Sequence, residues 1–172
     1  MKTIVLGGGC FWCMDPIFRM TDGVSKVVVG YAGGMKKNPS YRDVVYGKTG
    51  HAEVLQITYD PEKIELKKIF EIFFTIHDPT TMNQQGADKG TQYRSIILYE
   101  DDKDMILAHQ IITDLNNAKV YENPVVTEVV SLEEFYSAED YHQDYFNKNP
   151  EQSYCQLVIT PKIEKFNKVF KK

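Results

Sequence analysis

Short apolar runs typical of β-strands alternate with amphipathic helical segments along most of this chain of 172 residues. Residues 53–59 alternate most clearly between two sets of side chains, as the two faces of a strand do. Further strands are expected at residues 2–6, 24–31, 94–99 and 125–130. This alternation predicts an α+β fold, a two-layer α/β sandwich with a ferredoxin-like core, a mixed sheet and added helices.

Helix signals lie between these strands. Asp60 and Pro61 suit an N-cap and a first helical position, so the sequence predicts a helix that starts there. Another helix is expected to open at Asp101, and residues 137–140 resemble a capping box. Residues 163–170 are basic and amphipathic, and we expect them to form a surface helix docked on the sheet.

Length and composition indicate a single domain, residues 1–172. Hydrophobic residues make up 42% of the chain and aromatic residues 12%, which is enough for a globular core. No apolar run approaches the roughly 18 residues of a transmembrane helix, and a net charge of −4 favours neither nucleic acid nor an anionic membrane as a partner. The first strand leaves no room for a signal peptide, so we expect a cytoplasmic protein. We also expect it to be a monomer.

A glycine-rich turn carries the first of three cysteines. Residues 7–13 read Gly-Gly-Gly-Cys-Phe-Trp-Cys and follow an apolar strand. Three glycines and a tryptophan are unusual neighbours for a buried structural cysteine, which is the alternative, so the pattern favours a reactive thiol at Cys10. A helix begins either at Cys10, where its N-terminus would lower the pKa of the thiol, or later, at Asp15 and Pro16.

Polar groups stand near strand ends in three further loop segments. Tyr41 follows one glycine-rich loop, Glu53 begins a strand, and Asp88 and Tyr93 flank another glycine-bounded turn. Each has a local alternative, because Asp88 suits a turn, the tyrosines suit half-buried positions, and Glu53 suits a solvated strand edge. Together with an exposed-looking cysteine, the four segments favour a shared site.

Five motifs occur in order along nearly the whole chain, from residue 3 to residue 170. They are Gly9-Cys10-Phe11-Trp12, Gly50-His51-Ala52-Glu53, Gly90-Thr91-Gln92-Tyr93-Arg94-Ser95, Ala138-Glu139-Asp140-Tyr141-His142-Gln143 and Tyr154-Cys155. This set closely resembles the A-type peptide methionine sulfoxide reductases. Enzymes of this class restore one sulfoxide epimer of methionine, and the resemblance implies the S epimer, free or in proteins, as the substrate.

The resemblance assigns the reacting groups. Cys10 is implied to attack the sulfoxide sulfur while Glu53 protonates the sulfoxide oxygen. A carboxyl group with this role must hold a proton near neutral pH, so the pKa of Glu53 should lie above the ~4.3 of a free glutamate. Burial among aromatic side chains would raise it, because desolvation disfavours the charged form.

The remaining implied residues shape the pocket. Phe11 and Trp12 wall an apolar space for the methyl group on the substrate sulfur. Tyr41 and Tyr93 hydrogen-bond the sulfoxide oxygen, and Asp88 helps to hold the site. The resemblance implies neither a cofactor nor a metal.

The resemblance also implies a resolving thiol and an external reductant. Attack leaves Cys10 as a sulfenic acid, a second thiol condenses with it to a disulfide, and thioredoxin reduces the disulfide. Cys155, in the C-terminal segment 150–172, matches the family's resolving position and is favoured here. Cys13 stands three residues from Cys10 and remains an alternative or a secondary thiol.

Two other functions fit part of the pattern. Cys10 and Cys13 have the Cys-x-x-Cys spacing of a thiol–disulfide oxidoreductase, although that reading leaves Glu53 unexplained. Cys10, Cys13 and Cys155 with a histidine could also form a metal-binding module, although their spacing matches paired zinc ligands poorly. His51 and His142 are expected to make structural hydrogen bonds.

Overall fold

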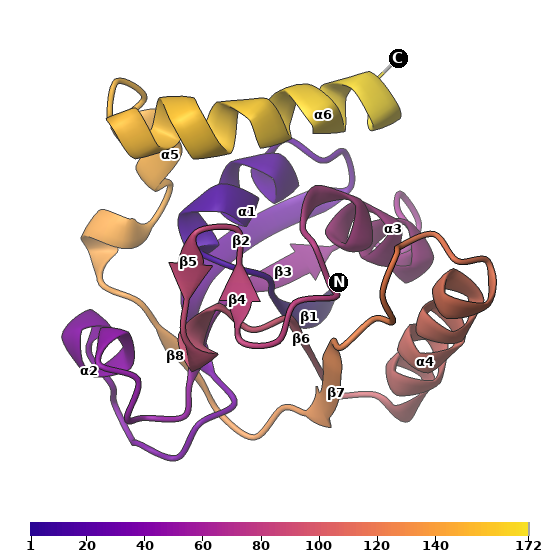
Figure 1. Ribbon diagram of the computed structural model, residues 1–172, viewed down its shortest axis with the longest axis horizontal. Helices are drawn as coiled ribbons and strands as arrows, with labels where there is room; N and C mark the ends of the chain where they lie inside the picture. Colours follow the sequence, from indigo (N-terminus) through magenta and orange to yellow (C-terminus); the bar gives the residue numbers. More distant parts are fainter. Residues whose placement is uncertain (172) are drawn as a thin grey trace.

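A six-stranded sheet forms the centre of the computed structural model, which describes residues 1–171 (Figure 1). Its strands lie in the order β7-β6-β1-β3-β2-β8, and every neighbouring pair is antiparallel except β6 and β7. Their bounds are β1 Lys2–Gly7, β2 Val24–Ala32, β3 Ala52–Tyr59, β6 Ile96–Tyr99, β7 Glu128–Ser131 and β8 Phe135–Ser137. A two-stranded sheet pairs β4 (Gln84–Gln85) with β5 (Asp88–Lys89).

The four central strands have ferredoxin-like topology. Helix α1 (Phe11–Arg19) connects β1 to β2, and helix α3 (Leu66–Ile76) connects β3 to β6. In each unit the two strands run parallel to each other, with a third, antiparallel strand inserted between them. The predicted α+β sandwich with a mixed sheet is therefore confirmed.

The remaining helices cover the outside of this core. They are α2 (Tyr41–Val45), α4 (Asp102–Asn117), α5 (Tyr145–Lys148) and α6 (Thr160–Phe170), with short turns at Thr91–Tyr93, Asp140–His142 and Cys155–Ile159. Helix α6 lies across α1 and α3 (Figure 1). The C-terminal helix thus packs on the helical layer rather than directly on the sheet, with Phe166 buried in the main core.

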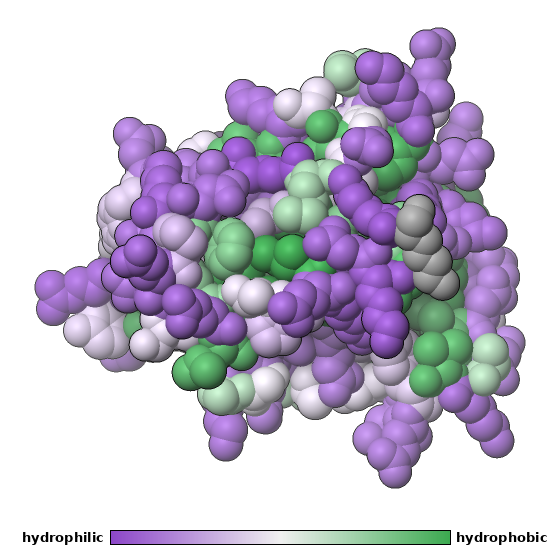
Figure 2. Space-filling view, turned by 90° about the horizontal axis from the view of Figure 1, so that it is seen from above, coloured by the Kyte–Doolittle hydropathy of each residue, from purple (hydrophilic) through white to green (hydrophobic). Residues whose placement is uncertain are grey.

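Alternating side chains separate the two faces of the sheet. Ile4 and Leu6 of β1 belong to the main core beneath the helices, whereas Val5 between them belongs to a smaller cluster on the opposite face. Seen over α6, the surface is mostly polar, with apolar side chains visible in between (Figure 2). Within residues 1–171 no helix combines the length and apolar character needed to cross a membrane.

Two predicted helix starts differ from the structure, and the open choice for α1 is settled in favour of Cys10. The helix expected at Asp60 begins at Leu66, because the Asp60 side chain accepts a hydrogen bond from the backbone of Glu62 and closes a separate turn. The pattern at 137–140 ends β8 instead of capping a helix. Helix α1 starts directly after Cys10, so Pro16 lies inside it. The predicted start at Asp101 is confirmed, since its side chain caps α4.

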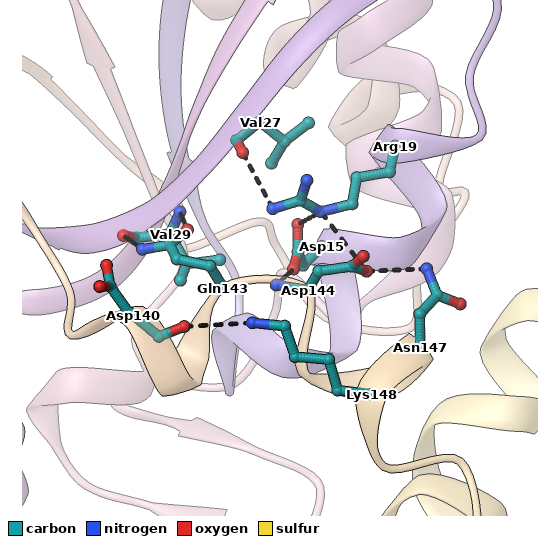
Figure 3. Close-up of polar contacts among 9 residues, drawn as sticks. All are labelled: Asp15, Arg19, Val27, Val29, Asp140, Gln143, Asp144, Asn147 and Lys148. Atoms are coloured by element: carbon teal, nitrogen blue, oxygen red, sulfur yellow. Dashed lines mark hydrogen bonds and ion pairs between the residues drawn. The ribbon is translucent and has the colours of Figure 1, made fainter.

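A buried polar cluster ties the C-terminal part of the chain to α1 (Figure 3). Asp15 is fully buried and accepts hydrogen bonds from Arg19 Nε at 2.6 Å and from the backbone N–H of Asp144 at 3.0 Å. Arg19 also donates to the Val27 carbonyl oxygen, and Gln143 makes a paired amide contact with Val29. Burial raises the pKa of Asp15 to about 6, against the lowering effect of Arg19. We name residues 140–148 the anchored segment.

Replacement of Arg19 should test this cluster. Arg19→Gln leaves the buried Asp15 carboxyl group without its cationic partner, so the free energy of unfolding should fall by about 2 kcal/mol, less than for a fully buried pair because Arg19 is partly exposed. The matched control is Lys36→Gln, which breaks the exposed pair with Asp43 and should change stability little. Equal denaturant midpoints for the two variants would contradict this prediction.

Candidate active site

The glycine turn ends β1 and delivers Cys10 to the start of α1. Gly9 has a φ of +93°, and its backbone N–H donates to the Tyr93 carbonyl oxygen at 3.1 Å. A Cβ atom at Gly7 would lie 2.8 Å from the Glu53 carbonyl oxygen, so a larger residue would separate β1 from β3. Cys10 is the N-cap of α1 and is only 8% exposed.

Glu53 lies beneath this first helical turn. It stands on β3 opposite Tyr31 of β2, on the helix-covered face, and is 1% exposed. The backbone N–H of Phe11 donates to Glu53 Oε1 at 3.1 Å, and the buried Oε2 has no hydrogen-bond partner among residues 1–171. Burial raises the pKa of Glu53 to about 8, so the carboxyl group is mostly protonated at neutral pH. The alternative of a solvated edge charge is therefore wrong.

Aromatic rings surround the helix start. Phe11 is buried, and the ring centroids of Phe11 and Trp12 each lie 6.4 Å from that of Tyr41. Tyr145 of the anchored segment stacks on Trp12 with a centroid distance of 3.8 Å and an interplanar angle of 8°. The structure thus brings Phe11, Trp12 and Tyr41 together beside Cys10, as the sequence predicts.

His142 holds the edge of Trp12. The indole Nε1–H of Trp12 donates to His142 Nδ1 at 3.0 Å, so Nδ1 carries no proton and a neutral ring carries its proton on Nε2. Burial lowers the pKa of His142 and favours this neutral form. The expected structural hydrogen bonding is confirmed here, and His51 likewise accepts from Gly34 N–H at 3.0 Å.

Glu139 fixes the position of Tyr41, a role that the sequence did not reveal. Its carboxylate accepts from the backbone N–H of Tyr41 and from the hydroxyl of Tyr31, both at 3.0 Å. Tyr93 enters from the other side, at the end of a short helical turn. Burial, and then the negative charge of Glu53, raises the pKa of Tyr41 and Tyr93, so both hydroxyls remain hydrogen-bond donors.

Asp88 and Cys13 meet at a tyrosine from the C-terminal chain. Tyr154 donates its hydroxyl proton to Asp88 Oδ2 at 2.8 Å, and the hydroxyl oxygen of Tyr154 lies 3.2 Å from Cys13 Sγ. Cys155, the next residue, is fully buried at the start of a π-helical turn that leads into α6. Tyr154 stands out in the sequence only through its place in the Tyr-Cys motif.

The thiols differ in their electrostatic surroundings. Burial raises the pKa of Cys10, and the hydrogen bond with Cys13 and the charge of Glu53 add to the rise. The contact with Cys10 lowers the pKa of Cys13. The helix N-terminus therefore does not make Cys10 acidic here, because desolvation outweighs it. No cluster of three metal-binding side chains occurs in residues 1–171, so the metal-binding alternative gains no geometric support.

A buried thiol, a protonated carboxyl group and an aromatic enclosure define a cysteine-dependent oxidoreductase. Comparison with known proteins gives the family. A family model described as peptide methionine sulfoxide reductase matches residues 2–172 of this chain. The chain belongs to this family, which confirms the resemblance seen in the sequence.

Individual relatives agree with this assignment. Two proteins named peptide methionine sulfoxide reductase MsrA are each 54% identical to this chain. The one from Trichodesmium erythraeum aligns over 170 residues, 99% of this chain and 96% of that protein. The one from Nautilia profundicola aligns over 169 residues, 98% of this chain and 96% of that protein.

Solved structures share the fold. Mxr1 from Saccharomyces cerevisiae in reduced form superposes with a TM-score of 0.84 at 41% identity, covering 90% of this chain and 88% of that chain. The crystal structure of Mxr1 in complex with Trx2 superposes with a TM-score of 0.60 at 30% identity, covering 84% of each chain.

The raised pKa of Glu53 predicts a cost in stability. A carboxyl group that binds its proton more tightly in the folded chain stabilises the fold most at low pH, and this contribution is lost as pH rises from about 4 through about 8. Glu53→Gln removes the ionisation. Between pH 5.5 and 8.5 the free energy of unfolding of the wild type should fall by about 3 kcal/mol more than that of the variant. Parallel pH profiles in urea melts would contradict it.

Proposed function

We propose that this protein reduces methionine S-sulfoxide, free or in oxidised proteins, to methionine, and that thioredoxin regenerates it. The observation that carries the reductive step is the protonated carboxyl group of Glu53, buried beneath the Cys10 turn. Membership of the peptide methionine sulfoxide reductase family supports methionine sulfoxide as the substrate. The complex of the related Mxr1 with Trx2 supports thioredoxin as the reductant.

The reductive step needs both an acid and a base at one place. A sulfoxide sulfur is a poor electrophile until its oxygen is protonated, and Glu53 supplies that proton. Cys10 then attacks the sulfur, and the Glu53 carboxylate takes up the thiol proton. The sulfur–oxygen bond of the substrate breaks and a sulfur–oxygen bond forms at Cys10, so the oxygen passes from the sulfoxide to the cysteine. Methionine leaves, Cys10 becomes a sulfenic acid, and two electrons pass from the thiol to the substrate.

The aromatic enclosure orients the substrate. Phe11 and Trp12 provide an apolar wall for the methyl group on sulfur, while the hydroxyls of Tyr41 and Tyr93 donate to the oxygen. Asp88 borders the same space and helps to hold the site. Apolar surroundings also exclude water from the reacting thiol, which keeps the Glu53 carboxyl group protonated.

The oxidised enzyme is resolved by Cys155. Its thiol attacks the Cys10 sulfenic acid, a disulfide forms, and one water molecule leaves. Cys155 is buried away from solvent, so the chain around it must move first. Cys13 is the alternative, because it lies three residues along α1 from Cys10 and the two thiols influence each other's pKa.

The protein acts as a single catalytic domain over residues 1–172, as a monomer without cofactor or metal, in the cytoplasm. The three cysteines are free thiols, and a reducing compartment such as the cytoplasm keeps thiols in this state, which supports the cytoplasmic location.

A single-turnover assay tests this function. Reduced enzyme mixed with one equivalent of methionine S-sulfoxide, without reductant, should form one equivalent of methionine, whereas the R epimer should give none. Cys10→Ser, or prior alkylation of Cys10, should abolish methionine formation because the nucleophile is lost. Methionine formation by Cys10→Ser would overturn the assignment.

Glu53→Gln supplies the second arm of this assay. Its rate of methionine formation at pH 7 should fall by roughly 100-fold, in the range expected for a positioned acid. The wild-type rate should decline as pH rises through about 8, where Glu53 ionises, and the variant should lack this decline. An unchanged rate in Glu53→Gln would remove this residue from the acid role.

Mass spectrometry of the oxidised product identifies the resolving thiol. After one turnover the wild type should contain a Cys10–Cys155 disulfide, and Cys13→Ser should still form it. Cys155→Ser should form methionine without that bridge. A Cys10–Cys13 bridge in the wild type would assign the role to Cys13, and loss of sulfoxide reduction in Cys13→Ser would favour a dithiol oxidoreductase instead.

A further inference from the structure

The hydroxyl of Tyr154 joins three parts of the site. It belongs to the C-terminal chain, directly before Cys155, yet it reaches Asp88 on β5 at 2.8 Å and Cys13 on α1 at 3.2 Å. Its ring also meets the edge of Trp12 at a centroid distance of 6.0 Å and an interplanar angle of 75°. One side chain thus connects the substrate pocket with the segment that carries Cys155.

Counting protons gives these hydrogen bonds a direction. A tyrosine hydroxyl carries one proton, and Tyr154 donates it to Asp88 Oδ2. The Tyr154 oxygen is then free to accept the S–H of Cys13. A group that binds Asp88 in place of Tyr154 therefore removes the strongest hydrogen bond of Tyr154. Hydrogen bonds to carboxylates are stronger than hydrogen bonds between neutral groups.

An exposed stretch of the C-terminal chain lies between the anchored segment and Tyr154. The anchored segment is fastened upstream, where Asp144 donates to the buried Asp15 (Figure 3). Residues 149–153 are mostly exposed, and Tyr154 makes the next side-chain contact with the site. Since Cys155 follows Tyr154 immediately, the two hydrogen bonds of Tyr154 also restrain the backbone that carries Cys155.

We propose that Tyr154 is a positioning residue that couples occupation of the substrate pocket to delivery of Cys155. This inference rests on the proposed function, in which Asp88 borders the space that the substrate occupies. With the pocket empty, the Tyr154 hydroxyl bridges Asp88 and Cys13 and keeps Cys155 buried. Substrate that contacts Asp88 displaces the hydroxyl, the turn that carries Tyr154 and Cys155 is released while α6 stays packed on α1 and α3, and Cys155 becomes able to attack the sulfenic acid on Cys10.

Alkylation of Cys155 measures this release. Cys155 is fully buried, so its reaction with iodoacetamide, followed by peptide mass mapping, reports how often the segment opens. In reduced enzyme without substrate, Tyr154→Phe should raise the Cys155 alkylation rate by roughly ten-fold, about 1.4 kcal/mol of opening free energy. The matched control is Tyr145→Phe, which removes a hydroxyl from the other tyrosine on Trp12 and should leave the rate near wild type.

A Cys10→Ser background tests the coupling without turnover. Methionine S-sulfoxide should accelerate Cys155 alkylation in Cys10→Ser, because substrate displaces Tyr154 from Asp88. In the double variant Cys10→Ser/Tyr154→Phe the rate should already be high and should not respond to sulfoxide. This arm uses the native Tyr154, so it remains informative even if Tyr154→Phe were to fold poorly.

The outcomes separate this proposal from the proposed function. Methionine formation by the wild type in single turnover reports the function separately from the alkylation of Cys155. Equal Cys155 alkylation in Tyr154→Phe and Tyr145→Phe, or no response of Cys10→Ser to sulfoxide, overturns the coupling even when methionine forms normally. Failure of the wild type to form methionine overturns the function itself.

Discussion

Burial of a protonated carboxyl group beneath the first turn of α1 is the interaction on which the rest of the site depends. Glu53 reaches this place because β3 lies between β1 and β2, so its helix-facing side chains sit under the helix that joins those two strands. The N–H of Phe11, which has no partner within the helix, donates to the carboxyl group. The glycines of the turn let β1, β3 and α1 approach closely enough for this contact.

The burial of Glu53 and Cys10 favours catalysis but lowers the stability of the folded protein at high pH. Burial disfavours the charged forms of both Glu53 and Cys10, so the resting site holds two protons and little net charge. A thiol in this state is unreactive until the substrate oxygen removes the proton from Glu53 and leaves a carboxylate that can accept the proton from Cys10. The same burial makes the folded protein less stable at high pH, as is typical of active sites that favour function over stability.

The sequence predicted the parts of the site that local patterns encode. The glycine turn with Cys10, Phe11 and Trp12 and the strand that begins near Glu53 are local patterns, and they lie where expected. Contacts between residues that are far apart in the sequence were harder to predict. Glu139 bonds with Tyr41 across 98 residues of sequence, and Tyr154 bonds with Asp88 across 66. Local rules also misplaced a helix start, since the Asp60 side chain closes a separate turn and α3 begins only at Leu66.

Two parts of the C-terminal chain contact helix α1 and have different functions. Asp15, in the middle of the helix, binds the anchored segment, and that segment supplies Tyr145 and His142, which cover one face and the edge of Trp12. The pocket wall is therefore fixed before substrate arrives. The chain beyond residue 149 carries Cys155 and contacts the site through Tyr154, whose hydrogen bonds can exchange partners. A rigid pocket and a movable thiol can thus lie within a few residues of each other. Buried polar contacts fix the pocket wall, whereas the segment that carries the thiol is held by Asp88, which the substrate can also contact.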